Sequence, residues 1–157
     1  MNTQPVTHSI FVIERTYPTT PERVFAAFSD PAKKRRWFVD GKGSEIQDFK
    51  MDFRVGGLEH SRFVITADNP VKGAVITNST TYQDIIPNRR IVLAYTMSMA
   101  DKPFSASQST FEFVPTEKGT KLLFTEQIAF FENSDGIEIR QDGWRKLLDT
   151  LGQELAR

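Results

Sequence analysis

The chain has 157 residues, which is enough for one domain with its own hydrophobic core, and we expect a single domain over residues 1–157. It has no cysteine, which excludes disulfides, thiol nucleophiles and cysteine-based metal sites. Lys plus Arg total 20 and Asp plus Glu total 20, and this balance predicts no nucleic-acid partner and no membrane partner.

The N-terminus lacks the basic and apolar regions of a signal peptide, and no apolar run is long enough to span a membrane. We therefore expect a cytoplasmic protein. The 13 Phe residues are typical of a thick core or an apolar pocket. The two histidines are isolated and the glycines do not form a phosphate-binding loop, so we expect no metal and no other cofactor.

The first third of the chain predicts a strand followed by two short helices. Residues 6–17 are rich in β-branched and aromatic side chains, which favours a strand. Thr19 and Glu22 fit a capping box at the start of a helix. Asp30 and Pro31 indicate a second short helix, whose basic run 33–36 we interpret as a solvated face.

From residue 44 to 130 the apolar side chains alternate with polar ones, which predicts an antiparallel meander of six strands. The last five strands are expected near residues 58–66, 73–86, 89–99, 104–115 and 119–131. Side chains of one parity should form the inward, concave face of this sheet. They are Ile91, Leu93, Tyr95, Met97, Phe111, Phe113, Leu122, Phe124 and Glu126.

The C-terminal segment predicts one long amphipathic helix, with Asp135 and Glu138 as its cap. Gly143 and Gly152 inside this helix suggest a close approach to the sheet. The sheet needs a cover on its apolar face, and this helix is the only element long enough to provide one. The sequence therefore predicts an α+β fold in which a curved sheet of six to seven antiparallel strands wraps around a long C-terminal helix and encloses a hydrophobic cavity.

Several short motifs, taken in order, resemble one known family. They are Glu14-Arg15-Thr16-Tyr17, Pro21-Glu22-Arg23-Val24-Phe25, Asp30-Pro31, Arg36-Trp37-Phe38, Asp52-Phe53-Arg54-Val55-Gly56-Gly57, residues 82–91, Gly119-Thr120-Lys121-Leu122, residues 124–127, and Gly143-Trp144. The chain resembles the START-like (SRPBCC, helix-grip) superfamily, and within it the bacterial branch of homologues of the C-terminal domain of the activator of heat-shock-protein-90 ATPase. The resemblance implies a hydrophobic tunnel under the last helix. Many relatives carry a His shortly before the Gly-Trp pair, where this chain has Arg140.

Three polar positions are the sharpest candidates for a functional site. Glu126 shares the inward parity of its strand, where burial should raise its pKa, so it is a candidate ligand anchor or general base. A structural ion pair to Arg140, Arg54 or Arg62 is the alternative. Tyr82 and Tyr95 lie on neighbouring strands, where a hydroxyl could orient a ligand or simply reach the rim of the core. For His60 the alternation does not decide which face it occupies.

The candidate cavity residues are aromatic, aliphatic or polar side chains expected on the inward faces. They are Trp37, Phe53, His60, Tyr82, Tyr95, Met97, Phe111, Phe113, Phe124, Glu126, Arg140, Trp144 and Leu148. For each apolar one, simple core packing is the alternative.

These observations favour a protein that binds a small apolar or amphipathic ligand between sheet and helix. One alternative, implied by the resemblance alone, is a co-chaperone-like or other protein-interaction module with a chaperone partner. Another is a cyclase- or dehydratase-type enzyme that uses Glu126, Tyr82 or His60 as acid–base groups, although no catalytic residue is assigned. Homodimerisation through an edge strand or the first helices stays open.

Overall fold

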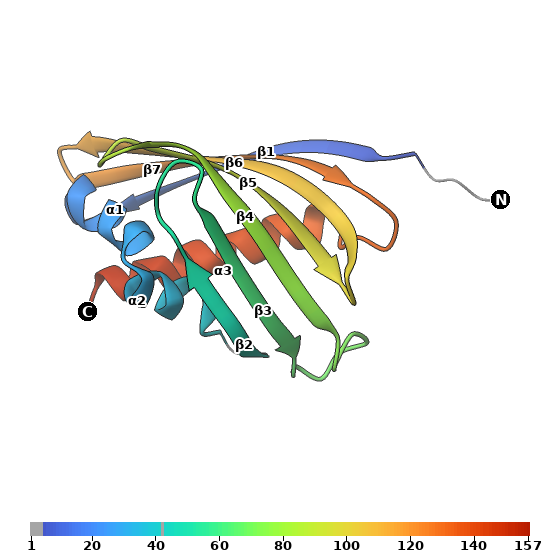
Figure 1. Ribbon diagram of the computed structural model, residues 1–157. Coiled ribbons are helices and arrows are strands. Elements are labelled where there is room, and N and C mark those ends of the chain that lie inside the picture. Colours follow the sequence, from blue (N-terminus) through green and yellow to red (C-terminus); the bar gives the residue numbers. More distant parts are fainter. Residues whose placement is uncertain (1–4, 42) are drawn as a thin grey trace.

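A computed structural model describes residues 5–41 and 43–157 of the chain. Its elements follow the order strand, helices, six strands, helix, as the sequence predicts (Figure 1). The curved sheet of seven antiparallel strands and the long C-terminal helix confirm the α+β helix-grip fold.

The strands pair in the order β1-β7-β6-β5-β4-β3-β2, so the meander is continuous and β1 joins its far edge. Their bounds are β1 (Thr7–Tyr17), β2 (Ser44–Met51), β3 (Leu58–Ile65), β4 (Val75–Ile86), β5 (Arg90–Met99), β6 (Lys102–Thr116) and β7 (Gly119–Phe130). The alternation of apolar and polar side chains sets the register, because a slip of one residue would expose the inward set. The predicted inward residues from Ile91 to Glu126 lie on the concave side.

The helices are α1 (Pro21–Ser29), α2 (Pro31–Lys34), the π-helix η1 (Arg35–Val39) and α3 (Ile137–Leu155). The first helix begins one residue later than the capping box predicted, because Thr20 accepts the Arg23 backbone N–H. The Asp30 carboxylate accepts backbone N–H groups of α2, as its position before proline suggested.

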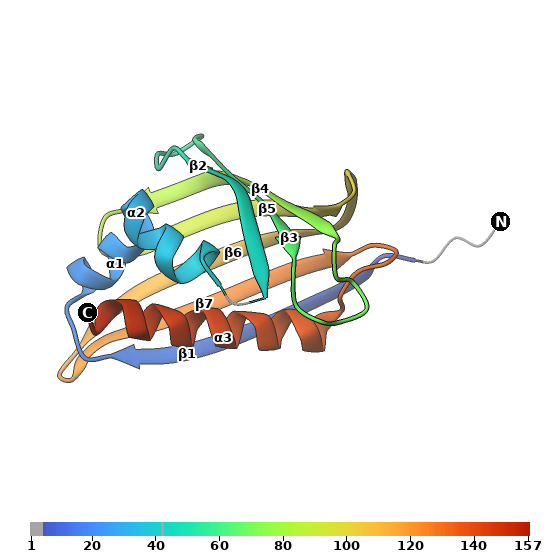
Figure 2. The same cartoon turned by 90° about the horizontal axis from the view of Figure 1, so that it is seen from below.

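Helix α3 lies along the concave side of the sheet, beneath β7 and β1 (Figure 2). The Tyr17 hydroxyl donates to the Leu148 carbonyl at 2.7 Å, and Arg36 pairs with the buried carboxylate of Glu154. These contacts fix the middle and the C-terminal end of the helix. No helix within residues 5–41 and 43–157 is long and apolar enough to cross a membrane.

Three local expectations need correction. Asp135 does not cap α3, which begins after Gly136 without a side-chain cap, because the Asp135 carboxylate binds Arg140 instead. The basic run 33–36 is not a solvated face throughout, since Lys34 is buried in an ion pair with Glu59. Gly143 does not approach the sheet: a Cβ there would meet no atom within 4 Å.

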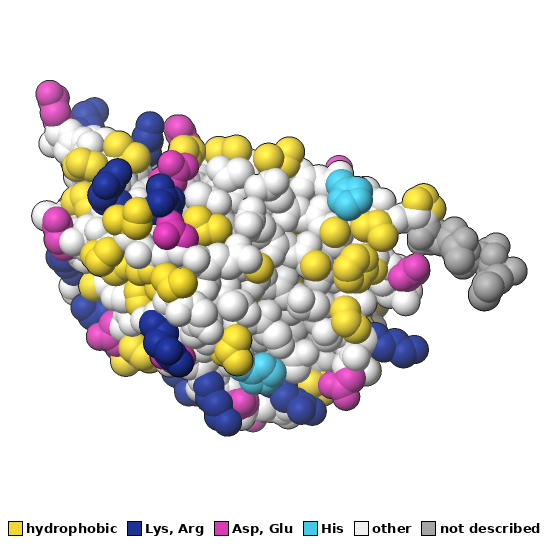
Figure 3. Space-filling view, turned by 45° about the horizontal axis from the view of Figure 1, so that its top comes forward, with side chains coloured by type: hydrophobic (Ala, Val, Ile, Leu, Met, Phe, Trp, Pro, Cys, Tyr) yellow, Lys and Arg dark blue, Asp and Glu magenta, His cyan; other side chains and the backbone are white. Residues whose placement is uncertain are grey.

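On the convex face of the sheet, charged side chains of both signs gather toward the margins, and the middle is almost free of them (Figure 3). A ladder of glutamines from β4, β6 and β7 passes over β5 on the outer side: Gln108 donates to Gln83 and accepts from Gln127.

Candidate functional site

A cavity of about 740 Å³ lies between the concave face of the sheet, η1 and α3. This volume falls within the range of roughly 300–1,000 Å³ that is usual for small-molecule sites. Because α3 lies under the β7 and β1 side of the sheet, strands β3, β4 and β5 are left to form most of the roof.

Most of the cavity wall is aromatic or aliphatic. Phe28, Trp37 and Phe38 come from the helices that follow β1, while Phe111 and Trp144 face them from β6 and α3. The ring of Phe28 packs edge to face on Trp37 at 4.9 Å between centroids, and the Trp37 indole N–H donates to the Ala27 carbonyl at 2.7 Å. These contacts satisfy the indole and hold the wall in place.

The mouth of the cavity is marked by lining residues that are themselves exposed to solvent. Val71, in the loop between β3 and β4, is 45% exposed, and Ile139, in the first turn of α3, is 66% exposed. Gly41, which follows η1, also lines this opening. Exposed apolar side chains at the edge of an apolar cavity are suited to guiding an apolar molecule inward.

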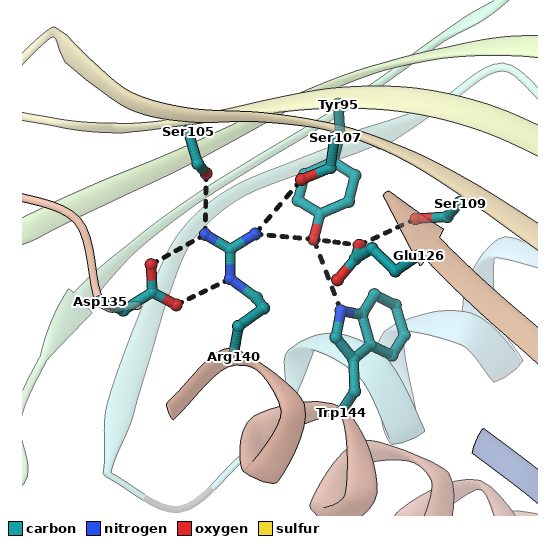
Figure 4. A network of polar contacts seen from close by, with 8 residues as sticks. All are labelled: Tyr95, Ser105, Ser107, Ser109, Glu126, Asp135, Arg140 and Trp144. Atoms are coloured by element: carbon teal, nitrogen blue, oxygen red, sulfur yellow. Dashed lines mark hydrogen bonds and ion pairs between the residues drawn. The ribbon is translucent and has the colours of Figure 1, made fainter. Parts of the chain in front are cut away.

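One polar network on the cavity wall is centred on Arg140, in the first turn of α3 (Figure 4). Its guanidinium forms a fork with the Asp135 carboxylate, through Nε at 2.7 Å and Nη2 at 2.9 Å. Nη2 also donates to Ser105 Oγ, and Nη1 donates to Ser107 Oγ and to the Tyr95 hydroxyl oxygen. These bonds join the start of α3 to the middle of the sheet.

Glu126 lies behind Tyr95 in the same network and is fully buried. Its Oε1 accepts the Tyr95 hydroxyl at 2.5 Å and the Ser109 hydroxyl at 2.9 Å, whereas Oε2 finds no hydrogen-bond partner among the described residues. Burial raises the pKa of Glu126 to about 7, against the lowering effect of the Tyr95 bond and the Arg140 charge. The alternative of a direct ion pair to an arginine is not what the structure shows, since Arg140 reaches Glu126 only through Tyr95.

A second polar cluster joins α2 to strands β3 and β4. Lys34 Nζ lies 2.7 Å from Glu59 Oε1, and both side chains are buried. The Tyr82 hydroxyl donates to the same Glu59 oxygen. The ammonium also lies 4.8 Å from the centre of the Phe38 ring, in a cation–π contact.

A third polar feature is an amide without a partner. Asn78 lines the cavity from β4, opposite Ser61 on β3 and Met97 on β5. Its Oδ1 is buried and accepts no hydrogen bond from any residue that the structure describes. A buried acceptor without a donor is uncommon in proteins and is costly unless something supplies the missing bond.

The structure brings part of the predicted site together around the cavity. Of the candidate residues, those that line it are Trp37, Tyr95, Met97, Phe111, Arg140 and Trp144. Except for Trp37 on η1, all come from elements whose inward parity or helical stripe was visible in the sequence.

The remaining candidates lie outside the lining. Tyr82 and Glu126 are buried one step behind it, bonded to Glu59 and Tyr95. Those that pack in the core are Phe53, Phe113, Phe124 and Leu148. His60 occupies the outer face of β3, with its side chain 40% exposed and Asp48 at 3.9 Å, because the buried parity of this strand is that of Glu59 and Ser61.

Sequence reasoning missed Lys34, Glu59, Asn78 and Asp135 as cavity residues. Lys34 and Glu59 are far apart in the chain, and each looks like an ordinary surface charge until the fold pairs them. The one available signal was the parity of β3, where Glu59 alternates in step with Ser61 and Phe63. Asn78 carries the same kind of signal, since it alternates in step with Ile76 and Tyr82 on β4.

Comparison with known proteins identifies the family to which the chain belongs. Residues 18–156 match the family described as Activator of Hsp90 ATPase homolog 1-like protein. The chain is 46% identical to the protein Mll3558 from Rhizobium loti, with a TM-score of 0.84 over 96% of this chain and 99% of that one. It is 35% identical to an uncharacterised protein from Rhizobium leguminosarum, with a TM-score of 0.88 over 98% and 97% of the two chains.

An AHSA1-like protein from Aeromonas hydrophila shares the fold, with 20% identity and a TM-score of 0.69 over 94% of this chain and 92% of that one. Among curated proteins, none matches the chain.

Proposed function

Because this chain belongs to the family of Activator of Hsp90 ATPase homolog 1-like proteins, a membership that supports a ligand-binding or interaction module, we propose that it binds a small amphipathic molecule in the cavity beneath its sheet. The observation that carries the proposal is the cavity of about 740 Å³, whose mainly apolar wall includes a few convergent polar groups. This combination is usual for small-molecule sites.

The geometry favours binding over turnover. The enzyme alternative uses Glu126, Tyr82 or His60 as acid–base groups, and none of these side chains lines the cavity. A general acid or base must come within hydrogen-bond reach of the reacting atoms, directly or through one water. Glu126 would have to act through Tyr95, whose own pKa burial raises above its ordinary range.

A leucine at position 143 provides a direct test of the proposed site. Gly143 lines the cavity and has open space beside it, so Gly143→Leu should fill part of the cavity without displacing other atoms. We expect the neutral, environment-sensitive dye Nile red to bind the wild type with increased fluorescence and to bind Gly143→Leu about tenfold more weakly or worse. Gly152→Ala, on the Tyr17 side of the helix, is the matched control and should bind like the wild type.

Native mass spectrometry of protein purified gently from its source organism complements this test. A bound molecule of defined mass on the wild type, absent from Gly143→Leu, would identify the natural ligand. Equal binding of Nile red by the wild type and by Gly143→Leu would contradict a ligand site in this cavity.

The family's name supplies a second candidate, interaction with a chaperone of the Hsp90 type. This candidate predicts that the purified protein changes the ATPase rate of such a chaperone, whatever occupies the cavity. An unchanged rate at a large excess of the protein would remove it.

A further inference from the structure

The charged side chains on the cavity wall form two closed pairs. Of the described residues that line the cavity, the charged ones are Lys34, Glu59, Asp135 and Arg140. Lys34 lies 2.7 Å from Glu59, and Arg140 lies 2.7 Å from Asp135. Each cation is therefore matched by an anion within the wall, and the formal charge presented to a ligand is zero.

Arg140 has no hydrogen-bond donor left for a ligand. A guanidinium carries five N–H groups. The structure assigns two of them to Asp135, one each to Ser105 and Ser107, and one to Tyr95, as Figure 4 shows. A ligand carboxylate could bind this fork only by displacing the carboxylate that already occupies it.

The ammonium of Lys34 is likewise occupied by groups of the cavity wall. Its ammonium donates to Glu59 and to the Tyr82 oxygen, and it lies over the ring of Phe38. An anionic ligand would leave water without gaining an unpaired cation, and burying an uncompensated charge is very costly. The partly ionised Glu126 behind Tyr95 adds further repulsion.

What the wall does offer is an uncharged acceptor. The Asn78 amide lines the cavity, and its buried Oδ1, which lacks a donor among residues 5–41 and 43–157, needs only a rotation of that amide to face a ligand. The hydroxyl residues Ser61 and Thr80 line the cavity beside it, on β3 and β4. A hydroxyl, amide or other neutral N–H group of a ligand would complete the hydrogen bonding of Asn78.

We infer that the cavity selects an uncharged amphipathic molecule that carries a hydrogen-bond donor, which Asn78 accepts, and that it excludes the corresponding carboxylate. This inference rests on the proposed function and adds the class of ligand. The two internal ion pairs serve to fix the wall and keep it electrically neutral.

The test uses pairs of probes that share a skeleton and differ in charge: dodecanamide with dodecanoate, and 2-naphthamide with 2-naphthoate. Each competes with Nile red for the wild-type protein at neutral pH. At least one amide should displace the dye about tenfold or more better than its own carboxylate. Equal or tighter binding of the carboxylates would overturn the inference while leaving the proposed function intact. Failure of Nile red and all four probes to bind would overturn both.

A change of charge in the cavity wall tests whether the charge pairing causes the selectivity against carboxylates. Asp135→Asn leaves Arg140 with an unmatched charge and a freed donor, so carboxylate binding should rise about tenfold while amide binding changes little. Asp84→Asn is the matched control, since it frees Arg90 from an ion pair of the same 2.7 Å length outside the cavity. Unchanged selectivity in Asp135→Asn, with the fold intact by circular dichroism, would overturn the role of charge pairing.

Asn78→Leu separates a ligand contact from a structural one. The variant removes an unsatisfied buried acceptor, so the empty protein should be as stable as the wild type or more stable. Its affinity for the amide probes should nevertheless fall by roughly fivefold or more, since their N–H groups lose the acceptor. A variant that loses stability and keeps its affinity would show that Asn78 serves the fold alone.

Discussion

At the residue scale, Glu126 is the group whose surroundings most change its chemistry. Its carboxyl is buried among apolar side chains, and only one of its two oxygens has hydrogen-bond partners among the described residues. The pKa of Glu126 rises to about 7, so this carboxyl is protonated in a large fraction of molecules at neutral pH. The protein therefore keeps a proton at a place where an exposed glutamate would have lost it.

This raised pKa predicts how stability depends on pH. The folded protein holds the proton more tightly than the unfolded chain, so the stabilisation due to protonated Glu126 is complete below its ordinary pKa of 4.5 and is lost as the pH rises through about 7. Glu126→Gln stays neutral at every pH. Its free energy of unfolding, relative to the wild type, should therefore increase by up to about 3 kcal/mol between pH 5 and pH 9.

Urea denaturation of both proteins across this range gives the difference directly. If the difference between the two proteins stayed constant with pH, Glu126 would have its ordinary pKa in the folded state and the burial argument would be wrong.

At the scale of elements, helix α3 is held at both ends by side chains from elsewhere. Arg140 ties its first turn to β5 and β6, and Glu154 in its last turn pairs with Arg36 of η1. The Tyr17 hydroxyl binds the Leu148 carbonyl between them. The first half of the helix can therefore line the cavity through residues such as Gly143 and Leu147, while Leu148 and Leu151 are buried in the core on its other side.

The glycines of α3 allow a test of this arrangement. Alanine stabilises a helix interior by about 1 kcal/mol relative to glycine. A Cβ at position 143 would meet no atom within 4 Å, and one at position 152 would touch the Tyr17 ring at 3.4 Å. Gly143→Ala should therefore raise the free energy of unfolding by about 1 kcal/mol, and Gly152→Ala by less. Thermal and urea unfolding of the two variants check this order. A loss of stability in Gly143→Ala would show that the cavity beside it is filled.

The strands and helices could be predicted from the sequence because their signals are local. The alternation that places Tyr95 and Phe111 on one face extends over a few residues. The strand ends that it predicts lie within a few residues of the observed ones. The cap of α3 was mispredicted for the opposite reason. Asp135 has the right residue type and place for a cap, but a buried guanidinium competes for it more strongly than backbone N–H groups do.

At the scale of the whole molecule, the same contrast between local patterns and long-range contacts explains which residues of the site could be predicted. Trp144 and Met97 line the cavity because an inward-facing residue in the right part of the sheet or helix must lie there. The ion pair of Lys34 with Glu59 depends instead on how α2 docks against β3, and no local pattern encodes that docking. Parity also could not separate Phe124, which is buried behind Trp144, from residues that reach the cavity itself.

The arrangement of the whole molecule predicts one route to the cavity. Because α3 is fixed at both ends, a ligand should pass through the mouth between Val71 and Ile139 rather than by displacement of the helix. The chain has no cysteine, so a single introduced thiol can be labelled uniquely. Ile139→Cys carrying a bulky maleimide should slow the association of Nile red about tenfold in stopped-flow measurements.

Val114→Cys with the same label is the control, because Val114 is an exposed apolar residue on β6 that does not line the cavity. Its association rate should match that of the unlabelled protein, and both labelled proteins should unfold at the same urea concentration as their unlabelled forms. A rate that is unchanged by the label at Ile139 would place the route elsewhere, and α3 would then have to move aside despite its fixed ends.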